Sequence, residues 1–219
     1  MTTYYVDPAA SGNDDGTSWT DAWSTMQRAI DGTNGTQPVA GDVVLCRGTE
    51  TVTVEIDYDG NSGNATGGLI TFRGVNASGV NDGTRYKLDA NTQTLTSVLR
   101  VHSPDYVCFE NFEIADNTGH GIRAANYAGA THWKFNNCYV HGNSSDGFNG
   151  GNSAHDFFEW IHCRFEDNGG DGFFGQDNDS FYFCTFSDNT GNGLEDANVQ
   201  GIYCLCYGCL FKGNGSMGS

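Results

Sequence analysis

The sequence predicts an all-β solenoid, in which short strands wind into coils that stack on one another. Three observations predict it: a short motif recurs along the second half of the chain, apolar residues alternate within the motif, and glycine is abundant. Glycine accounts for 31 of 219 residues, against an average share of about 7%. A motif with a period of about 20–50 residues is typical of solenoids, in which each repeat buries its apolar face against its neighbours.

The motif consists of a Phe or Cys, an Asn five residues later and a Gly four residues after the Asn. Its five copies are Phe112, Asn117 and Gly121; Cys138, Asn143 and Gly147; Cys163, Asn168 and Gly172; Cys184, Asn189 and Gly193; and Cys209, Asn214 and Gly218. The steps between copies are 26, 25, 21 and 25 residues. Apolar side chains such as Cys138 and Val140 lie two residues apart, which is the period of a half-buried strand. Each copy is therefore predicted to be one coil of a single-stranded parallel β-helix, with coils about 4.8 Å apart.

Equivalent positions of successive coils should form columns. We expect Asn117, Asn143, Asn168, Asn189 and Asn214 to stack at one corner, because Asn tolerates left-handed backbone and its amide can bond to the amides above and below. Gly121, Gly147, Gly172 and Gly193 are expected to supply a positive φ at the next bend. A second polar column is predicted at Asn126, Asn152, Asp177 and Asn198.

The eight cysteines fit the core of such a stack. Cys138, Cys163, Cys184 and Cys209 share the inward position of Phe112, and Cys206 shares that of Phe181. A buried Cys behaves as a small hydrophobe, and a straight column does not converge as tetrahedral zinc ligands do. We therefore expect core residues, with a disulfide or a metal as the alternative.

The first third of the chain is less regular. Residues 1–40 are predicted to form a strand at Tyr4–Val6, a loop and a short capping helix that Thr20 begins, with an apolar stripe at Trp23, Met26 and Ile30. Residues 41–219 should form the coils. Further strands are predicted, listed here by their ranges: Val43–Leu45, Thr51–Ile56, Leu69–Phe72 and Ser97–Val101.

The opening of the chain resembles that of many right-handed parallel β-helix proteins, including pectate-lyase-like polysaccharide lyases and phage tail-associated proteins. The resemblance lies in Tyr4–Pro8, Gly12–Trp19, Met26–Ile30, Ala40–Val44 and Arg47–Thr49. It implies a right-handed β-helix for essentially the whole chain. It does not specify an activity, because this fold is shared by lyases, hydrolases, epimerases, adhesins and inert stalks.

The net charge and the sequence at the two ends of the chain limit the ligands and partners that we expect. With 27 Asp and Glu against 10 Lys and Arg, the net charge is −17, which disfavours nucleic acid and acidic membrane surfaces as ligands. The sequence contains no run of 18 apolar residues, which a membrane-spanning helix would need. A strand that is predicted to start by residue 4 leaves no room for a signal peptide. We expect a virion component or an extracellular protein. The motif is still in register at Gly218, so we expect an open C-terminal end that meets a further segment, another copy in a homo-oligomer such as a trimer, or an adjoining virion subunit.

The candidate site is the column just before the glycines, formed by His120, Asp146, Asp171 and Asn192. Asp146 and Asp171 should lie about 5 Å apart on adjacent strands, near the separation found in retaining glycosidases, and calcium could bind between them. His120 and Arg123 complete the candidate catalytic group. The alternative is a solvated turn, since Asp-Gly is an ordinary turn dipeptide.

Three functions remain open. The first is a structural or receptor-binding β-helix of a virion or cell surface that contacts a polysaccharide or surface glycan and needs no cofactor. The second is a polysaccharide lyase or glycosidase that acts at Asp146 and Asp171. The third is a calcium-stabilised stalk. The sequence favours the first function. Polysaccharide lyases with the β-helix fold that the chain resembles generally use a Lys or Arg as the base, beside carboxylates that bind calcium, and neither Lys134 nor Arg123 completes such a motif.

Overall fold

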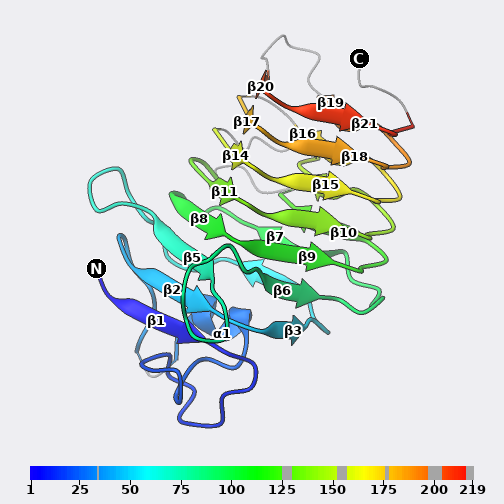
Figure 1. Ribbon diagram of the computed structural model, residues 1–219. Coiled ribbons are helices and arrows are strands. Elements are labelled where there is room, and N and C mark those ends of the chain that lie inside the picture. Colours follow the sequence, from blue (N-terminus) through cyan, green and yellow to red (C-terminus); the bar gives the residue numbers. More distant parts are fainter. Residues whose placement is uncertain (34, 125–129, 152–156, 176–177, 197–203, 216–219) are drawn as a thin grey trace.

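The computed structural model describes residues 1–219 apart from 34, 125–129, 152–156, 176–177, 197–203 and 216–219. The described residues form 21 short strands and one helix, and the strands lie in three sheets (Figure 1). Each coil contributes one strand to each sheet in turn, and all the strand pairs within the sheets are parallel, as between β12 (Tyr139–His141) and β15 (Arg164–Glu166). The predicted parallel β-helix is confirmed.

The first sheet contains β1 (Thr3–Val6), β2 (Val43–Cys46), β5 (Ile70–Gly74), β8 (Val107–Glu110), β11 (Lys134–Asn136), β14 (Glu159–Ile161), β17 (Ser180–Tyr182) and β20 (Leu205–Tyr207). The second contains β3 (Thr49–Thr51), β6 (Tyr86–Asp89), β9 (Phe112–Ala115), β12, β15, β18 (Thr185–Ser187) and β21 (Leu210–Lys212). The third contains β4 (Ile56–Tyr58), β7 (Ser97–Val101), β10 (His120–Arg123), β13 (Phe148–Asn149), β16 (Phe173–Gly175) and β19 (Leu194–Asp196).

Stacked rings and thiols fill the interior. Phe109, Phe135, Trp160 and Phe181 form one column, in which the Phe135 and Trp160 ring centroids are 4.1 Å apart. Cys138, Cys163 and Cys184 are buried, and the Cys163 thiol donates to the Phe135 carbonyl of the preceding coil at 3.4 Å. No disulfide links the eight cysteines, and five of them are buried as predicted, whereas Cys204 and Cys209 are partly exposed. Cys206 stands in register with Phe181, but it is exposed.

The asparagine column is a continuous chain of buried amides. Asn143 Nδ2 donates to Asn168 Oδ1 at 3.0 Å, and Asn168 Nδ2 donates to Asn189 Oδ1 at 3.0 Å. Their oxygens also accept backbone N–H groups from the preceding coil, for example Asn143 N to Asn168 Oδ1 at 3.3 Å. The expected left-handed backbone at these residues is wrong. It occurs one residue earlier, at Asp116, Gly142, Asp167, Asp188 and Gly213.

The glycine column has a different cause from the one predicted. Gly121, Gly147, Gly172 and Gly193 do not have a positive φ. Coils approach so closely there that a Cβ on Gly147 would lie 2.5 Å from the Gly172 carbonyl oxygen and 2.9 Å from Asn168 Nδ2. Close approach, and not a left-handed bend, therefore requires glycine at these positions. The second predicted polar column, Asn126, Asn152, Asp177 and Asn198, lies outside the described residues.

The N-terminal region differs from the prediction at two points. The helix α1 (Met26–Asp31) is capped by Thr25 and not by Thr20, because the chain bends through residues 14–21 and Trp23 then forms a parallel bridge to Val6 before the helix begins. The stretch Thr51–Ile56 is not one strand: the chain turns a corner within it, between β3 and β4. The alternation of apolar residues continues through the bend that joins β3 in the second sheet to β4 in the third, and it was therefore misinterpreted as one strand.

Glu50, at the centre of β3, joins α1 to the coils. Its carboxylate accepts from Met26 N at 2.8 Å and from the Tyr86 hydroxyl at 2.6 Å. Burial raises the pKa of Glu50, although both hydrogen bonds oppose that rise. Within the part of the chain that the structure describes, no helix has the length and apolar character needed to cross a bilayer.

Replacing Asn168 by Ala should lower the free energy of unfolding by about 2–4 kcal/mol, because it removes the buried oxygen that accepts from Asn143 N and Nδ2 and the amide that donates to Asn189 Oδ1 and the Val140 carbonyl. Urea denaturation followed by circular dichroism measures the change. Asn136→Ala is the matched control, since Asn136 lies partly exposed in β11. Equal stability of the two variants would contradict a structural role for the amide chain.

Candidate functional site

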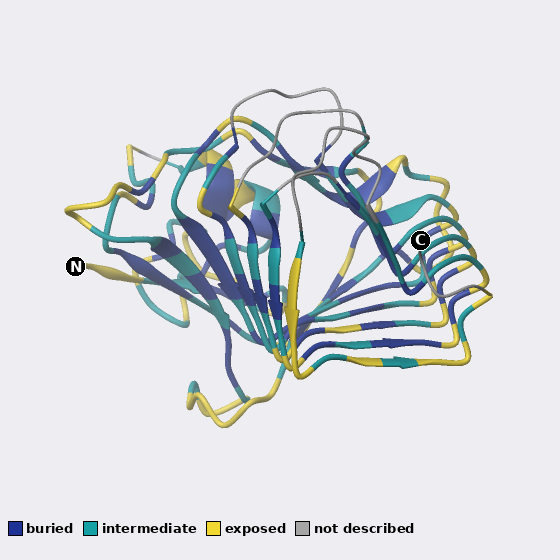
Figure 2. Ribbon diagram, turned by 90° about the horizontal axis from the view of Figure 1, so that it is seen from above, coloured by how far each residue is buried: buried dark blue, intermediate teal, exposed yellow. Residues whose placement is uncertain are grey.

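The third sheet presents a row of partly exposed side chains, one from each coil. The row, called here the outer row, consists of Asp57, Arg100, Arg123, Asn149, Phe174 and Glu195, which are in register from strand to strand. Residues preceding them along their strands, such as Ile56, Leu99 and Ile122, are buried. Strand alternation thus directs the outer row to solvent. Figure 2 looks along the stack and shows the coils lying over one another, with buried backbone in dark blue along the strands and exposed residues at many of the turns.

The predicted column His120, Asp146, Asp171 and Asn192 lies at the start of the same strands. Asp146 and Asp171 each accept the backbone N–H of the next coil: Asp171 N donates to Asp146 Oδ1 at 2.9 Å, and Asn192 N donates to Asp171 Oδ1 at 2.5 Å. His120 Nδ1 lies 3.3 Å from Asp146 N and 3.2 Å from Asp146 Oδ2, so it accepts from the backbone when it carries no proton and donates to the carboxylate when it carries one. The structure therefore brings together three of the four residues predicted to be catalytic. Their first role is to satisfy backbone donors where the coil bends.

The two aspartates of this column have opposite electrostatic surroundings. Burial acts to raise the pKa of Asp146, but hydrogen bonds from His120, Asn149 and Asp171 N outweigh it, so the pKa is lowered. The His120 and Asn149 donors lie 3.2 and 2.6 Å from Asp146 Oδ2. For Asp171, burial raises the pKa, and the charges of Asp146 and Glu195 raise it further. Relative to a free aspartate, the ionised form is therefore favoured at Asp146 and disfavoured at Asp171.

Arg123, the fourth candidate catalytic residue, is not paired with Asp146 in the structure. In the sheet Arg123 stands between Arg100 and Asn149, three residues beyond the His120–Asp146 column. Its guanidinium makes no hydrogen bond or ion pair with a described residue. Arg123 thus belongs to the outer row, where it presents a cation to solvent.

Sequence reasoning missed a charged cluster at the β4 and β7 end of the row. The Arg100 guanidinium contacts Asp57 and lies 3.1 Å from Glu55 Oε1, and His102 Nε2 lies 2.6 Å from Asp57 Oδ1. The cluster could not be found while Thr51–Ile56 was interpreted as one strand, because β4 and its register with β7 were then absent. The available signal was the alternation that places Arg100 between buried Leu99 and Val101.

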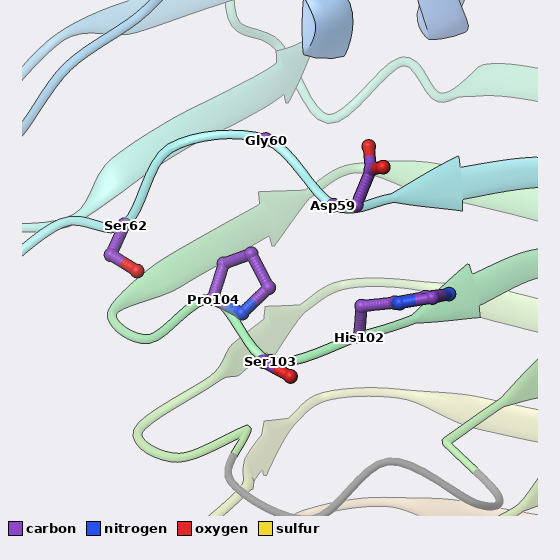
Figure 3. Close-up of a pocket in the computed structure, with 6 residues that line it drawn as sticks. All are labelled: Asp59, Gly60, Ser62, His102, Ser103 and Pro104. Carbon is purple, nitrogen blue, oxygen red and sulfur yellow. The ribbon is translucent and has the colours of Figure 1, made fainter.

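A hollow of about 300 Å³ opens beside this cluster (Figure 3). Two loops line it: Asp59, Gly60 and Ser62 follow β4, while His102, Ser103 and Pro104 follow β7. Figure 3 shows the two loops facing each other across the opening, with Asp59 and His102 on opposite sides. The hollow extends the polar surface of the outer row past the end of the strands.

The donor set does not fit calcium. Within the described ranges, no group of three or more His, Cys, Asp or Glu is arranged to hold a metal ion, whereas calcium takes 6–8 oxygen ligands. Asp146 already accepts hydrogen bonds from Asp171 N, Asn149 and His120. The calcium site predicted at Asp146 and Asp171 therefore stays a prediction.

No family model and no curated protein matches the chain, but solved structures do. A pectate lyase, Pel9A, aligns with a TM-score of 0.67 and 19% identity over 90% of this chain and 51% of its own. The chain has the right-handed parallel β-helix fold. A rhamnogalacturonan lyase aligns with the β-helix at a TM-score of 0.68 and 18% identity, over 100% of this chain and 60% of its own. A pectin methylesterase from Aspergillus niger aligns at 0.62 and 19%, over 100% and 69%.

These likenesses establish the fold of the β-helix and nothing finer, because the sequences are less than 25% identical. The β-helix spans about half the length of the pectate lyase and 60% of the rhamnogalacturonan lyase.

Opposite substitution effects should follow from the two pKa shifts. Because the pKa of Asp146 is lowered in the fold, its contribution is present above pH of about 4 and is lost as pH falls through the folded pKa. Asp146→Asn should therefore destabilise the protein at pH 7 by about 1–3 kcal/mol, and the difference from wild type should shrink in acid.

Asp171 has the opposite sign. Its raised pKa means that the ionised form is disfavoured in the fold, so the cost appears as pH rises above about 4 through the folded pKa. Asp171→Asn should leave the protein equally or more stable at pH 7. Thermal melts of both variants between pH 3 and pH 7 test the pair, and a loss of stability in Asp171→Asn equal to that in Asp146→Asn would refute the assignment.

Proposed function

We propose that this protein is a receptor-binding β-helix of a virion or cell surface, and that it holds an extended polysaccharide along the outer row. One observation carries the proposal: six coils each place one hydrogen-bonding, cationic or aromatic side chain at the same position of the third sheet. Parallel strands repeat about every 4.8 Å, so the row is a regular linear surface suited to a linear polymer.

The composition of the row suits a sugar chain. Arg123 and Asn149 can donate hydrogen bonds to hydroxyl or carboxylate oxygens, and Glu195 can accept them. The ring of Phe174 lies among these polar groups and offers an apolar surface to the face of a sugar ring. The names of the three similar structures, a pectate lyase, a rhamnogalacturonan lyase and a pectin methylesterase, refer to polysaccharides, which supports this ligand class.

Phe174→Ala should weaken polysaccharide binding about ten-fold or more, because burying a Phe side chain contributes about 1.5–3 kcal/mol. Affinity electrophoresis or a glycan array identifies a bound polysaccharide, and titration then gives its Kd. Tyr139→Ala is the matched control, since Tyr139 is a partly exposed aromatic residue on the second sheet. If both variants bind as the wild type does, or lose affinity equally, the outer row is not the binding surface.

A second candidate is glycosidic cleavage, favoured by the opposite pKa shifts of Asp146 and Asp171. Adjacent carboxyl groups whose pKa values are driven apart are suited to acid and base roles. Asp171 would protonate the leaving glycosidic oxygen, and ionised Asp146, positioned by His120, would stabilise the positive charge that develops on the sugar. A water molecule would then add to the sugar carbon and return its proton to Asp171. Arg123 would orient the chain through its free guanidinium.

Cleavage makes its own prediction. Asp171→Asn should abolish product formation from any polysaccharide that the wild type cleaves, while the far-UV circular dichroism and the Kd stay unchanged. Reducing-end release and absorbance at 235 nm distinguish hydrolysis from elimination. A wild type that binds a polysaccharide and releases no product from it over a day would eliminate this candidate and leave the binding role.

A further inference from the structure

A hollow of about 560 Å³ lies at the corner between the first and second sheets, where no function has yet been placed. Its walls come from Arg47 and Thr49 at the turn from β2 to β3, and from Ala77, Thr84 and Arg85 in the loop between β5 and β6. The volume falls in the range of ligand sites, about 300–1,000 Å³. None of the residues that line the hollow belongs to the outer row, so the two surfaces are separate.

Arg47 has two of its three guanidinium nitrogens hydrogen-bonded to described residues. Its Nε donates to Asp7 Oδ2 at 2.7 Å, its Nη1 donates to the Ala77 carbonyl at 3.0 Å, and its guanidinium carbon lies 4.1 Å from the centroid of the Trp19 ring. Its Nη2 donates to no described residue. The side chain is thus positioned before any ligand arrives, and it keeps donors that a ligand can use.

Arg85 carries a charge that no carboxylate neutralises among the described residues. Its Nε donates to the Asn137 carbonyl at 2.9 Å, and its Nη2 donates to Asn137 Oδ1 at 2.6 Å. Its Nη1 has no described acceptor. The nearest acid along the chain, Asp82, is engaged within its own loop by Asn76 and Thr84. A chain with a net charge of −17 therefore places two arginines and one aspartate around this hollow.

We propose that the hollow binds a carboxylate-bearing sugar acid. A guanidinium edge matches a carboxylate in a bidentate arrangement, and Arg47 and Arg85 each retain an Nη group for it. The Thr49 side chain adds a hydroxyl group to the lining of the hollow. Val75 and Ala77 form an apolar wall against which a sugar ring can pack. Because both guanidinium groups are already held by Asn137, Asp7 and Ala77, little side-chain entropy is lost on binding.

The probes are glucuronate, glucose and inorganic phosphate, each titrated into the full chain by calorimetry at low salt. Glucuronate should bind, glucose should bind at least ten-fold more weakly, and phosphate should not match glucuronate. Arg85→Gln should weaken glucuronate binding about ten-fold or more, because a hydrogen bond to a charged group is lost. Arg85→Lys, which keeps the charge and loses the planar fork, should give an intermediate loss. Arg164→Gln, on the outer face of the second sheet, should leave the affinity unchanged.

Three results would overturn the proposal: equal affinity of wild type and Arg85→Gln, equal loss in Arg85→Gln and Arg164→Gln, or equal affinity for glucuronate and phosphate. Melting curves recorded beside each titration show that the variants are folded. If Arg85→Gln does not fold, Arg85→Lys and the glucose arm carry the test by themselves. Because this hollow and the outer row share no residue, Phe174→Ala should bind glucuronate normally, and failure of one site leaves the other unaffected.

Discussion

Exact coil-to-coil register is the constraint on which every other feature of this protein depends. Parallel backbone hydrogen bonds alone do not fix it, since a strand shifted by two residues keeps its inward and outward faces. The buried asparagine chain supplies what is missing. From Asn143 to Asn189, each amide donates to the oxygen of the amide in the next coil, and that oxygen also accepts a backbone N–H. A slipped coil would leave these groups buried and unpaired, at a cost of about 1–3 kcal/mol for each group.

The corners show how far the chain departs from local preference to keep that register. Left-handed backbone recurs in columns, and some of these positions hold bulky residues that seldom adopt it, such as Tyr106, Phe157 and Phe183. Their rings stack along the columns: the centroids of His162 and Phe183 are 5.4 Å apart, and those of Tyr106 and His132 are 4.5 Å apart. Stacking between coils offsets local strain that a single coil could not sustain.

Register also explains why the outer faces differ in character. On the second sheet the exposed side chains satisfy one another: Lys87 lies 2.9 Å from Asp89, the Tyr139 hydroxyl donates to Glu166 at 2.8 Å, and His141 lies 3.2 Å from Glu113. On the third sheet Arg123 and Phe174 stand in line without such partners among the described residues. Mutually paired polar groups on the second sheet stabilise the stack, whereas Arg123 and Phe174 on the third sheet keep surfaces that the proposed polysaccharide can contact. The free edges of Arg47 and Arg85 repeat this contrast at a corner.

The sequence by itself determined the repeating part: the coils, the inward cysteines, the asparagine chain and the column of His120, Asp146 and Asp171. It could do so because in a solenoid the sequence period equals one turn of the chain, so equivalent positions lie over one another. Only the tertiary structure decided why the glycines are required, where Thr51–Ile56 bends, and which groups meet outside the repeats. Asp57 with His102, and Arg47 with Arg85, come together through irregular loops whose lengths carry no period, and no pattern in the sequence could place them.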